Sequence, residues 1–423
     1  MSAGRTTVVI IGAGQAGLAM SRCLTDRSID HVVLERGDVA NAWRTERWDS
    51  LRLLTPNWLT RLPSWSYAGD DPDGYMTAAE VARMLVDYRR SFEAPVVAGT
   101  EVTMVRPAGE RFVVTTTNGT WTSDAVVVAT GAAGTPNLPP VATALPHSVD
   151  QLTPIRYRNP AQLDDGAVLV VGGSASGVQI ADELARSGRR VTISVGDHVR
   201  VPRTYRGMDI HWWMDTIGQL DERIGDVGDV GRARRLPSLQ LVGSPERRAV
   251  DLNALVGVGV SVVGRTVGVR GDRVQFSGSL ANFVRSADLK QERLLDRIDE
   301  YVCDHGLTHE VDAPDRPAPT QLPTPDLDLD LRAVRTVIWA TGFRPRYPWL
   351  DDAFLDERGS IRHVDGVAAV PGAYVLGLTF LRRRKSNFID GVGPDAEELS
   401  AHLAAHLGRA RSRAPLAAVP ERS

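Results

Sequence analysis

Two glycine-rich segments hold the residues best suited to chemistry in this sequence. The first, GAGQAG at residues 12–17, follows the continuous β-branched run at residues 6–11 and precedes apolar residues at helical spacing. In a G-x-G-x-x-G turn the first glycine makes the tight turn, the second lets the backbone approach a pyrophosphate, and the third lets helix and strand pack closely. The helix N-terminus supplies unpaired N–H groups for the phosphates. The segment predicts a dinucleotide site.

An acidic residue supports this prediction. Glu35 lies eighteen residues after Gly17, at the end of a second predicted strand at residues 31–34. A carboxylate at this place accepts hydrogen bonds from the ribose hydroxyls of the dinucleotide. We therefore expect a βαβ unit at residues 6–35.

The second glycine segment, GGSASG at residues 172–177, follows the β-rich run at residues 167–171. It keeps the first and third glycines and has Ser174 at the second. Serine still lets a phosphate approach and can donate its own hydroxyl. This segment predicts a second dinucleotide fold.

The residues after the second turn favour NADPH over NADH. The position that matches Glu35 is Val195, which is not an acid, and Arg200 and Arg203 follow it. Absence of the acid together with nearby arginines is what a 2′-phosphate requires. The alternative, that these arginines belong to a solvated surface loop, stays open.

Composition sets the protein class. The chain has 423 residues, 43% of them hydrophobic and 24% charged, with a formal net charge of −3. It reads as an ordinary globular protein of two or three domains, with no electrostatic reason to bind nucleic acid or an anionic membrane. Cys23 and Cys303 form no Cys-x-x-Cys, which argues against a metal site, a redox dithiol and a disulfide framework. With no signal-peptide or membrane-helix pattern, we expect a cytoplasmic protein.

Five segments together resemble the class B flavoprotein monooxygenases, the group of flavin-containing monooxygenases and YUCCA-like enzymes. They are GAGQAG, Trp43-Arg44 followed by RWDSLRLLTP at residues 47–56, ATG at 129–131, the second glycine turn, and ATGFRP at 340–345. The resemblance covers essentially the whole chain. It implies FAD at the first turn and NADPH at the second.

The predicted fold is α/β, with two Rossmann-like dinucleotide-binding domains. Asn118-Gly119 signals a hairpin, so a β-meander should interrupt the FAD domain before the strand at residues 125–129. The strand-like residues 335–341 and 374–378 should return to the first sheet. We expect a discontinuous FAD domain at 1–145 and 334–410, an NADPH domain with a helical insertion at 146–333, and a flexible tail at 411–423. Residues 313–325 read as an extended linker.

The motifs and the resemblance give a list of expected cofactor contacts. For FAD these are Gly12, Gly14, Gln15, Ala16, Gly17, Glu35, Arg36, Trp43, Arg44, Val102, Thr130, Gly131, Gly391 and Val392. For NADPH they are Gly172, Ser174, Ala175, Ser176, Gln179, Arg200, Arg203 and Thr341.

The resemblance also assigns particular roles. Trp43 would pack near the isoalloxazine, with core packing as the alternative. Residues 391–395 (GVGPD) would open a helix aimed at the flavin pyrimidine, with a plain surface helix as the alternative. Trp212 and Trp213 could wall the substrate pocket or simply pack. Asn57 is the nearest counterpart of a catalytic Asn, although a turn-forming Asn fits the position after Pro56.

One motif departs from the family. Its F-x-G-x-x-x-H linker is reduced to His147-Ser148, with Val141 and Thr143 at the aromatic and glycine positions. This weakens the case for Baeyer–Villiger chemistry and leaves that for heteroatom oxygenation.

The resulting hypothesis is a monooxygenase that forms a C4a-(hydro)peroxyflavin and transfers oxygen from O2 to nitrogen or sulfur of a small organic substrate. Oxidative decarboxylation of a 2-oxo acid is the next alternative, followed by an NADPH-dependent oxidase or reductase. A flavin redox sensor that docks a partner through Arg382 to Lys385 is the non-enzyme alternative; a solvated face is the plainer interpretation of that charge run. A homodimer stays an open option.

Overall fold

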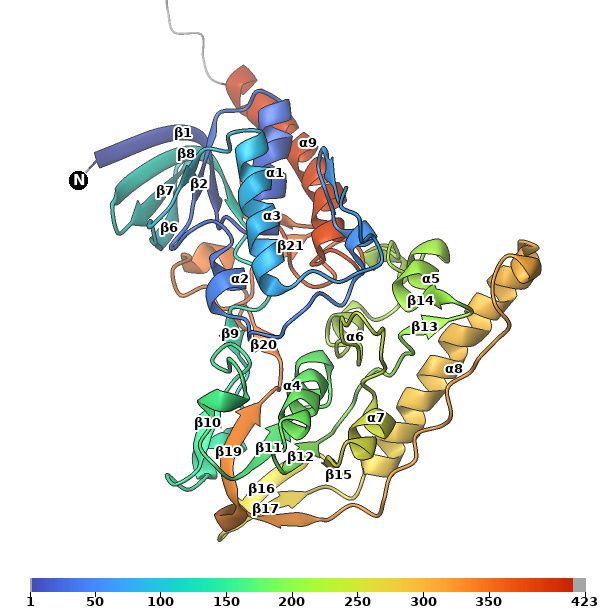
Figure 1. The fold of residues 1–423 in the computed structure, drawn as a ribbon. Coiled ribbons are helices and arrows are strands. Elements are labelled where there is room, and N and C mark those ends of the chain that lie inside the picture. The colour runs from blue at the N-terminus through green and yellow to red at the C-terminus, as the bar shows by residue number, and fades with distance from the viewer. Residues whose placement is uncertain (1, 414–423) are drawn as a thin grey trace, which may run out of the picture.

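The computed structural model describes residues 2–413, in two α/β bodies joined by crossing segments (Figure 1). The first body is built on a nine-stranded sheet with the order β21-β22-β23-β8-β1-β2-β5, to which β7 and β6 add beside β8. Its strands are β1 (Ser2–Ile11), β2 (His31–Leu34), β5 (Val96–Val97), β6 (Val102–Ala108), β7 (Arg111–Thr116), β8 (Gly119–Val128), β21 (His363–Val364), β22 (Val367–Ala368) and β23 (Ala373–Val375).

The centre of this sheet is parallel and buried. β1 lies between β2 and β8 and pairs in parallel with both. Val8, Val9 and Ile10 are fully buried, because helices cover the sheet and leave no polar face for these β-branched side chains. The helices of this body are α1 (Gln15–Asp26), α2 (Asn41–Thr45), α3 (Ala78–Ser91) and α9 (Ile389–Arg413). α1 packs against both α3 and α9 (Figure 1).

The predicted β-meander is confirmed as β6-β7-β8, all antiparallel. Its tight turn differs by one residue from the expectation. Thr116 pairs with Gly119, so the two loop residues are Thr117 and Asn118, and Gly119 takes a positive φ of 141° at the start of β8.

The second body has a five-stranded parallel sheet with the order β10-β19-β11-β12-β15. The strands are β10 (Asp150–Leu152), β11 (Ala167–Val171), β12 (Val191–Ser194), β15 (Ser261–Val263) and β19 (Val334–Trp339). The helices are α4 (Ala175–Arg186), α5 (Ile210–Thr216), α6 (Val230–Arg234), α7 (Leu252–Gly257) and α8 (Leu280–Asp304). Short antiparallel ribbons complete it: β13 (Thr204–Tyr205) with β14 (Met208–Asp209), and β16 (Thr266–Arg270) with β17 (Arg273–Phe276) and β18 (Asp328–Asp330).

One predicted strand joins the other sheet. Residues 335–341 were expected in the first sheet, but β19 lies between β10 and β11 in the second. The prediction for residues 374–378 is right, because β23 pairs with β8. A short strand buried on both faces carries no mark of its neighbours, so its sequence could not choose between two similar sheets. We therefore propose a domain crossing after Trp339 rather than at residue 334; the other boundaries stay predictions.

Two segments cross between the bodies side by side. β9 (Thr135–Pro136) pairs antiparallel with β20 (Phe343–Arg344). Thr341 Oγ1 donates to the carbonyl oxygen of Asn137 at 2.5 Å, and Asn137 N donates to the carbonyl oxygen of Gly342 at 2.9 Å. The outward and return crossings therefore support each other. The remaining ribbon, β3 (Arg61–Leu62) with β4 (Trp65–Ser66), belongs to the first body.

The expected linker at residues 313–325 runs along α8 (Figure 1). Arg316 pairs with Glu292, Asp296 and Asp299, which face it from three successive turns of α8. The segment is therefore a strap fixed by ion pairs. The predicted tail at 411–423 is described only to Arg413, where α9 ends; its other residues lie outside the described part. Within residues 2–413, no helix is long and apolar enough to cross a membrane.

Candidate active site

A cavity of about 660 Å³ opens at the carboxyl ends of β1, β2 and β8. This is where an open parallel sheet binds ligands. Its walls include ten of the residues predicted to contact FAD, namely Gly12, Gly14, Gln15, Ala16, Glu35, Arg36, Trp43, Val102, Thr130 and Gly131. The sequence motifs therefore predicted many of the residues that line this cavity, although these residues come from segments far apart in the chain.

The first glycine turn has the predicted geometry. Gly12 has a φ of 105°, a conformation that favours glycine. A Cβ atom at Gly17 would lie 1.8 Å from the carbonyl oxygen of Gly12, so Gly17 allows close helix–strand packing and does not line the cavity. A Cβ at Gly14 would meet nothing within 4 Å. The N-terminus of α1 thus faces open space where a pyrophosphate fits.

Glu35 is held in a fixed orientation at the edge of the cavity. It is 8% exposed, and its two carboxylate oxygens accept from Ala13 N at 2.8 Å and Gly37 N at 3.0 Å. A carboxylate has further lone pairs for ribose hydroxyls. The residues present therefore fit an adenine dinucleotide.

Trp43 is a wall of this cavity and is only partly buried. Its indole Nε1 donates to Gln15 Oε1 at 3.2 Å, and the Arg47 guanidinium lies 5.1 Å from the ring centroid. Asn387, which also lines the cavity, was missed from the sequence. Arg47, another lining residue, begins the segment 47–57 that the family resemblance places on the substrate side of the flavin. The sequence feature that could have indicated Asn387 is its position two residues before the start of the C-terminal helix α9.

Three predicted FAD contacts lie elsewhere. Arg44 is absent from the cavity wall and pairs with Asp38 at 3.7 Å. Val392 is fully buried, and a Cβ at Gly391 would lie 1.6 Å from the carbonyl oxygen of Lys385, so both pack inside the protein. The reason is that α9 begins at Ile389, two residues before the expected start, and Pro394 lies within the helix. The cavity-lining residue of this region is Asn387.

The second glycine turn repeats the conformation of the first. Gly172 has a φ of 119°, and a Cβ at Gly177 would lie 1.8 Å from the carbonyl oxygen of Gly172. Ser174 has φ −93° and ψ −176°, close to the −85° and −170° of Gly14. A negative φ suits any residue, which explains why serine replaces glycine without strain. Its side chain makes no capping hydrogen bond, so the hydroxyl is free for a ligand.

The two arginines on which the NADPH prediction rested are already paired with carboxylates of the protein. Arg200 is 3% exposed and pairs with Asp251 at 2.7 Å and Asp288 at 2.8 Å. Arg203 is 2% exposed and pairs with Asp209 at 2.7 Å. The prediction that they bind a 2′-phosphate is therefore wrong, and so is the surface-loop alternative. Their carboxylate partners lie up to 88 residues away in the sequence, which spacing could not reveal.

Two further predicted NADPH contacts serve as structural ties. Gln179 Nε2 donates to the carbonyl oxygen of Leu241 at 2.7 Å, and the Thr341 hydroxyl fixes the crossing segments. Ala175 and Ser176 open α4 beside Ser174, as expected. Gln240, missed from the sequence, is buried and donates from Nε2 to the carbonyl oxygen of Gly173 at 2.7 Å.

The tryptophan pair is a packing feature. Trp213 is fully buried in an apolar cluster, and its Nε1 donates to the carbonyl oxygen of Tyr205 at 2.7 Å. Trp212 meets it edge to face at 4.7 Å. Neither lines the cavity. The substrate-pocket prediction is replaced by the packing alternative.

Asn57 is structural as well. Its Nδ2 donates to the carbonyl oxygen of Asp71 at 2.9 Å, and its Oδ1 accepts from Met76 N at 2.9 Å. Both ends of the amide are used to shape the loop, so the turn-forming interpretation holds and the catalytic one does not.

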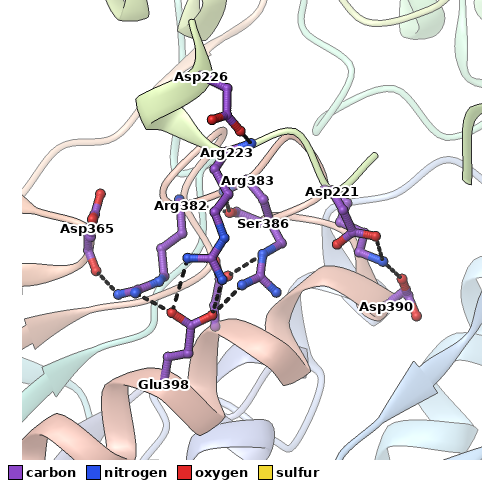
Figure 2. Close-up of polar contacts among 11 residues, drawn as sticks. Asp221, Arg223, Asp226, Asp365, Arg382, Arg383, Ser386, Asp390 and Glu398 are labelled. Carbon is purple, nitrogen blue, oxygen red and sulfur yellow. Dashed lines mark hydrogen bonds and ion pairs between the residues drawn. The ribbon is translucent and has the colours of Figure 1, made fainter. Parts of the chain in front are cut away.

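The charge run Arg382 to Lys385 belongs to a partly buried ion-pair network, whose contacts Figure 2 shows. Arg382, Arg383 and Arg223 converge on Glu398 of α9. Lys385, 6% exposed at its side chain, pairs with Asp390 at 2.8 Å and Asp221 at 3.0 Å. This arrangement fits neither the docking patch nor the solvated face. It ties the 221–223 segment, in the stretch between β12 and β15, to the C-terminal helix of the first body.

Comparison with known proteins identifies related oxidoreductases. Residues 9–213 match the sequence family described as pyridine nucleotide-disulphide oxidoreductase. An oxidoreductase of Geobacillus kaustophilus described as CzcO-like is 36% identical over 93% of this chain and 96% of its own length. The probable indole-3-pyruvate monooxygenase YUCCA10 of Arabidopsis thaliana is 32% identical over 47% of this chain and 53% of its own.

Two solved structures share the fold. A flavin-containing monooxygenase from Stenotrophomonas maltophilia superposes with a TM-score of 0.66 at 21% identity, covering 96% of this chain and 99% of that one. An ornithine N-hydroxylase from Kutzneria sp. 744 gives 0.64 at 16% identity, covering 95% and 100%.

The two matching glycine turns and the cavity fit FAD and NADP as cofactors, and the fold is that of flavoprotein oxidoreductases, flavin-containing monooxygenases among them. By sequence, the chain belongs to the family of CzcO-like oxidoreductases.

Gly14 and Gly17 should respond differently to the same substitution. In Gly14→Ala the new methyl group enters open space in the apoprotein, so we expect unchanged apoprotein stability and FAD affinity at least about tenfold weaker. In Gly17→Ala the methyl group clashes with Gly12, so we expect a lower Tm with and without FAD. Tm and FAD titration of both variants test this; a stable Gly17→Ala protein or a Gly14→Ala protein with normal FAD affinity would contradict it.

Asp395 should make stability depend on pH. It is fully buried in α9, with Arg383 Nε 3.5 Å away, and burial raises the pKa of its carboxyl to about 6 against the opposing effect of Arg383. Because the folded state holds the proton more tightly, this carboxyl lowers stability as pH rises from about 4 to about 6, with no further change above that.

The variant Asp395→Asn lacks this ionisation. We expect its Tm, relative to that of the unmodified protein, to rise between pH 4 and pH 7 and then level off. Exposed Asp70→Asn is the control. A Tm difference that stays constant across this range would show that Asp395 does not titrate there.

Proposed function

We propose that this protein is an FAD- and NADPH-dependent monooxygenase that inserts one oxygen atom from O2 into a small organic substrate, at nitrogen or sulfur. The observation that carries the proposal is a pair of dinucleotide turns with no protein dithiol to receive electrons. Cys23 is buried, burial raises the pKa of its thiol to about 12, and it does not line the cavity. Cys303, the other cysteine, is exposed. Electrons that reach the flavin must therefore leave to a diffusible acceptor.

The chain's own residues bind and orient the reactants. The α1 N-terminus and Glu35 would hold the FAD pyrophosphate and ribose. The α4 N-terminus and the Ser174 hydroxyl would hold the NADPH pyrophosphate. Trp43 and Asn387 restrict the flavin in the cavity. When bound, the flavin would supply the two-electron chemistry between NADPH and O2. The cavity walls then exclude water from the reacting atoms.

Arg265 is our candidate for the NADPH 2′-phosphate. It lies against the loop after β12, since a Cβ at Gly196 would be 2.9 Å from its Nε. Its guanidinium covers the Phe283 ring at 5.2 Å and has no carboxylate partner among the described residues. The acid of this loop, Asp197, pairs with Lys290 at 3.1 Å, which reduces its ability to repel a phosphate.

We expect Arg265→Ala to raise the KM for NADPH about tenfold or more, as for loss of a charge-assisted phosphate contact, and to leave that for NADH nearly unchanged. Steady-state kinetics with both nucleotides measure this. The exposed Arg285→Ala, on α8, is the control. Equal effects on both nucleotides would mean that Arg265 acts on something other than the 2′-phosphate.

A second candidate is oxidative decarboxylation of a 2-oxo acid. Its support is the similarity, over about half of this chain, to proteins named as indole-3-pyruvate monooxygenases. A reducing cytoplasm as the location and a homodimer as the assembly stay proposals.

The test compares NADPH oxidised with H2O2 released by the purified holoenzyme, with amines, sulfides and 2-oxo acids added in turn. A monooxygenase should consume more NADPH than it releases H2O2 when a substrate is present, and the deficit should equal the product. Equal amounts with every compound would indicate an oxidase or reductase. Negligible NADPH consumption throughout would favour a redox sensor.

A further inference from the structure

Arg47 places a cation without a counter-ion in the wall of the FAD cavity. Its Nη1 donates to the carbonyl oxygen of Glu46 at 2.9 Å, and the guanidinium lies 5.1 Å from the centroid of the Trp43 ring. Burial lowers the pKa of this guanidinium, against the effect of Glu46, yet an arginine stays charged at neutral pH. Among residues 4–410, no carboxylate lies within ion-pair distance of it.

The neighbouring acid does not fill this role. The Glu46 carboxylate pairs with Arg36 at 2.5 Å. The buried arginines among the described residues each have a carboxylate partner: Arg200 has Asp251, Arg203 has Asp209, and Arg383 has Glu398. Arg47 is half-buried and has none. Since a charge withdrawn from water is costly unless it is paired, an unpaired guanidinium in a cavity wall points to an anion that arrives from outside.

The position of Arg47 shows which reactant this is. Its carbonyl oxygen accepts from Arg158 Nη1 at 2.5 Å, and Trp48, the next residue, packs in the apolar core of the second body. Arg47 therefore lies where the second body adjoins the FAD cavity. Both dinucleotide pyrophosphates have their own helix N-termini, at α1 and α4, so the oxidised substrate is the reactant left to supply an anion.

We infer that Arg47 is a specificity-determining residue that binds a carboxylate of the substrate, so that the substrates are organic acids. A guanidinium offers parallel N–H donors that match a carboxylate in a bidentate pair, and its stacking on Trp43 fixes the plane of this fork. The inference rests on the proposed function, because it needs a substrate at the flavin.

The experiment measures binding and needs no turnover. The holoenzyme is titrated, without NADPH, with matched acid and methyl ester pairs: 3-(methylthio)propionate and phenylacetate, each against its ester. The change in visible flavin absorbance reports binding. We expect at least about tenfold tighter binding of an acid than of its ester, the scale of one charge-assisted contact. Arg47→Met should remove this preference, and Arg47→Lys should retain part of it.

Two further readouts exclude other roles. FAD content and the Kd for NADP⁺ should be the same in all three proteins. A loss of FAD or NADP⁺ affinity in Arg47→Met would assign Arg47 to a cofactor and overturn the inference. So would equal binding of acids and esters by the unmodified protein. A protein that prefers acids through Arg47 but turns all NADPH into H2O2 would contradict the monooxygenase proposal and leave this assignment intact.

Discussion

The strand-to-helix turn at residues 12–17 is the constraint on which the rest of the structure depends. Gly17 packs so closely on the carbonyl oxygen of Gly12 that a Cβ atom would lie 1.8 Å from it. This contact seats α1 on the sheet and directs its N-terminus at the cavity. In the second body, a Cβ atom at Gly177 would likewise lie 1.8 Å from the carbonyl oxygen of Gly172. Two equal solutions to one steric problem thus place two helix N-termini where a pyrophosphate fits.

The second requirement is that the two bodies are held together. The β9–β20 pair fixes the crossing segments, while the ion pairs around Glu398 and Lys385 tie the 221–223 segment to α9. That network adjoins Asn387 in the chain, and Asn387 lines the cavity. Domain packing and cofactor binding therefore share the segment at residues 382–390. The charge run that suggested an exposed surface in the sequence is in fact partly buried and paired with carboxylates.

Local features could be predicted from the sequence, and long-range pairings could not. The glycine turns, Glu35 and the meander follow from steric rules that act within about ten to twenty residues. Arg200 forms ion pairs with Asp251 and Asp288, and only folding of the chain brings these residues near it. The predictions for Trp213 and for the strand β19 failed for a related reason. An apolar segment does not specify which partner it packs against.

The most direct test of the central claim uses O2 labelled with oxygen-18. The holoenzyme is given NADPH and methyl phenyl sulfide or 3-(methylthio)propionate, and the product is analysed by mass spectrometry. We predict one labelled oxygen atom in each product molecule, with product and H2O2 together equal to the NADPH consumed. NADPH oxidation whose labelled oxygen appears only in H2O2 and never in an organic product would contradict it.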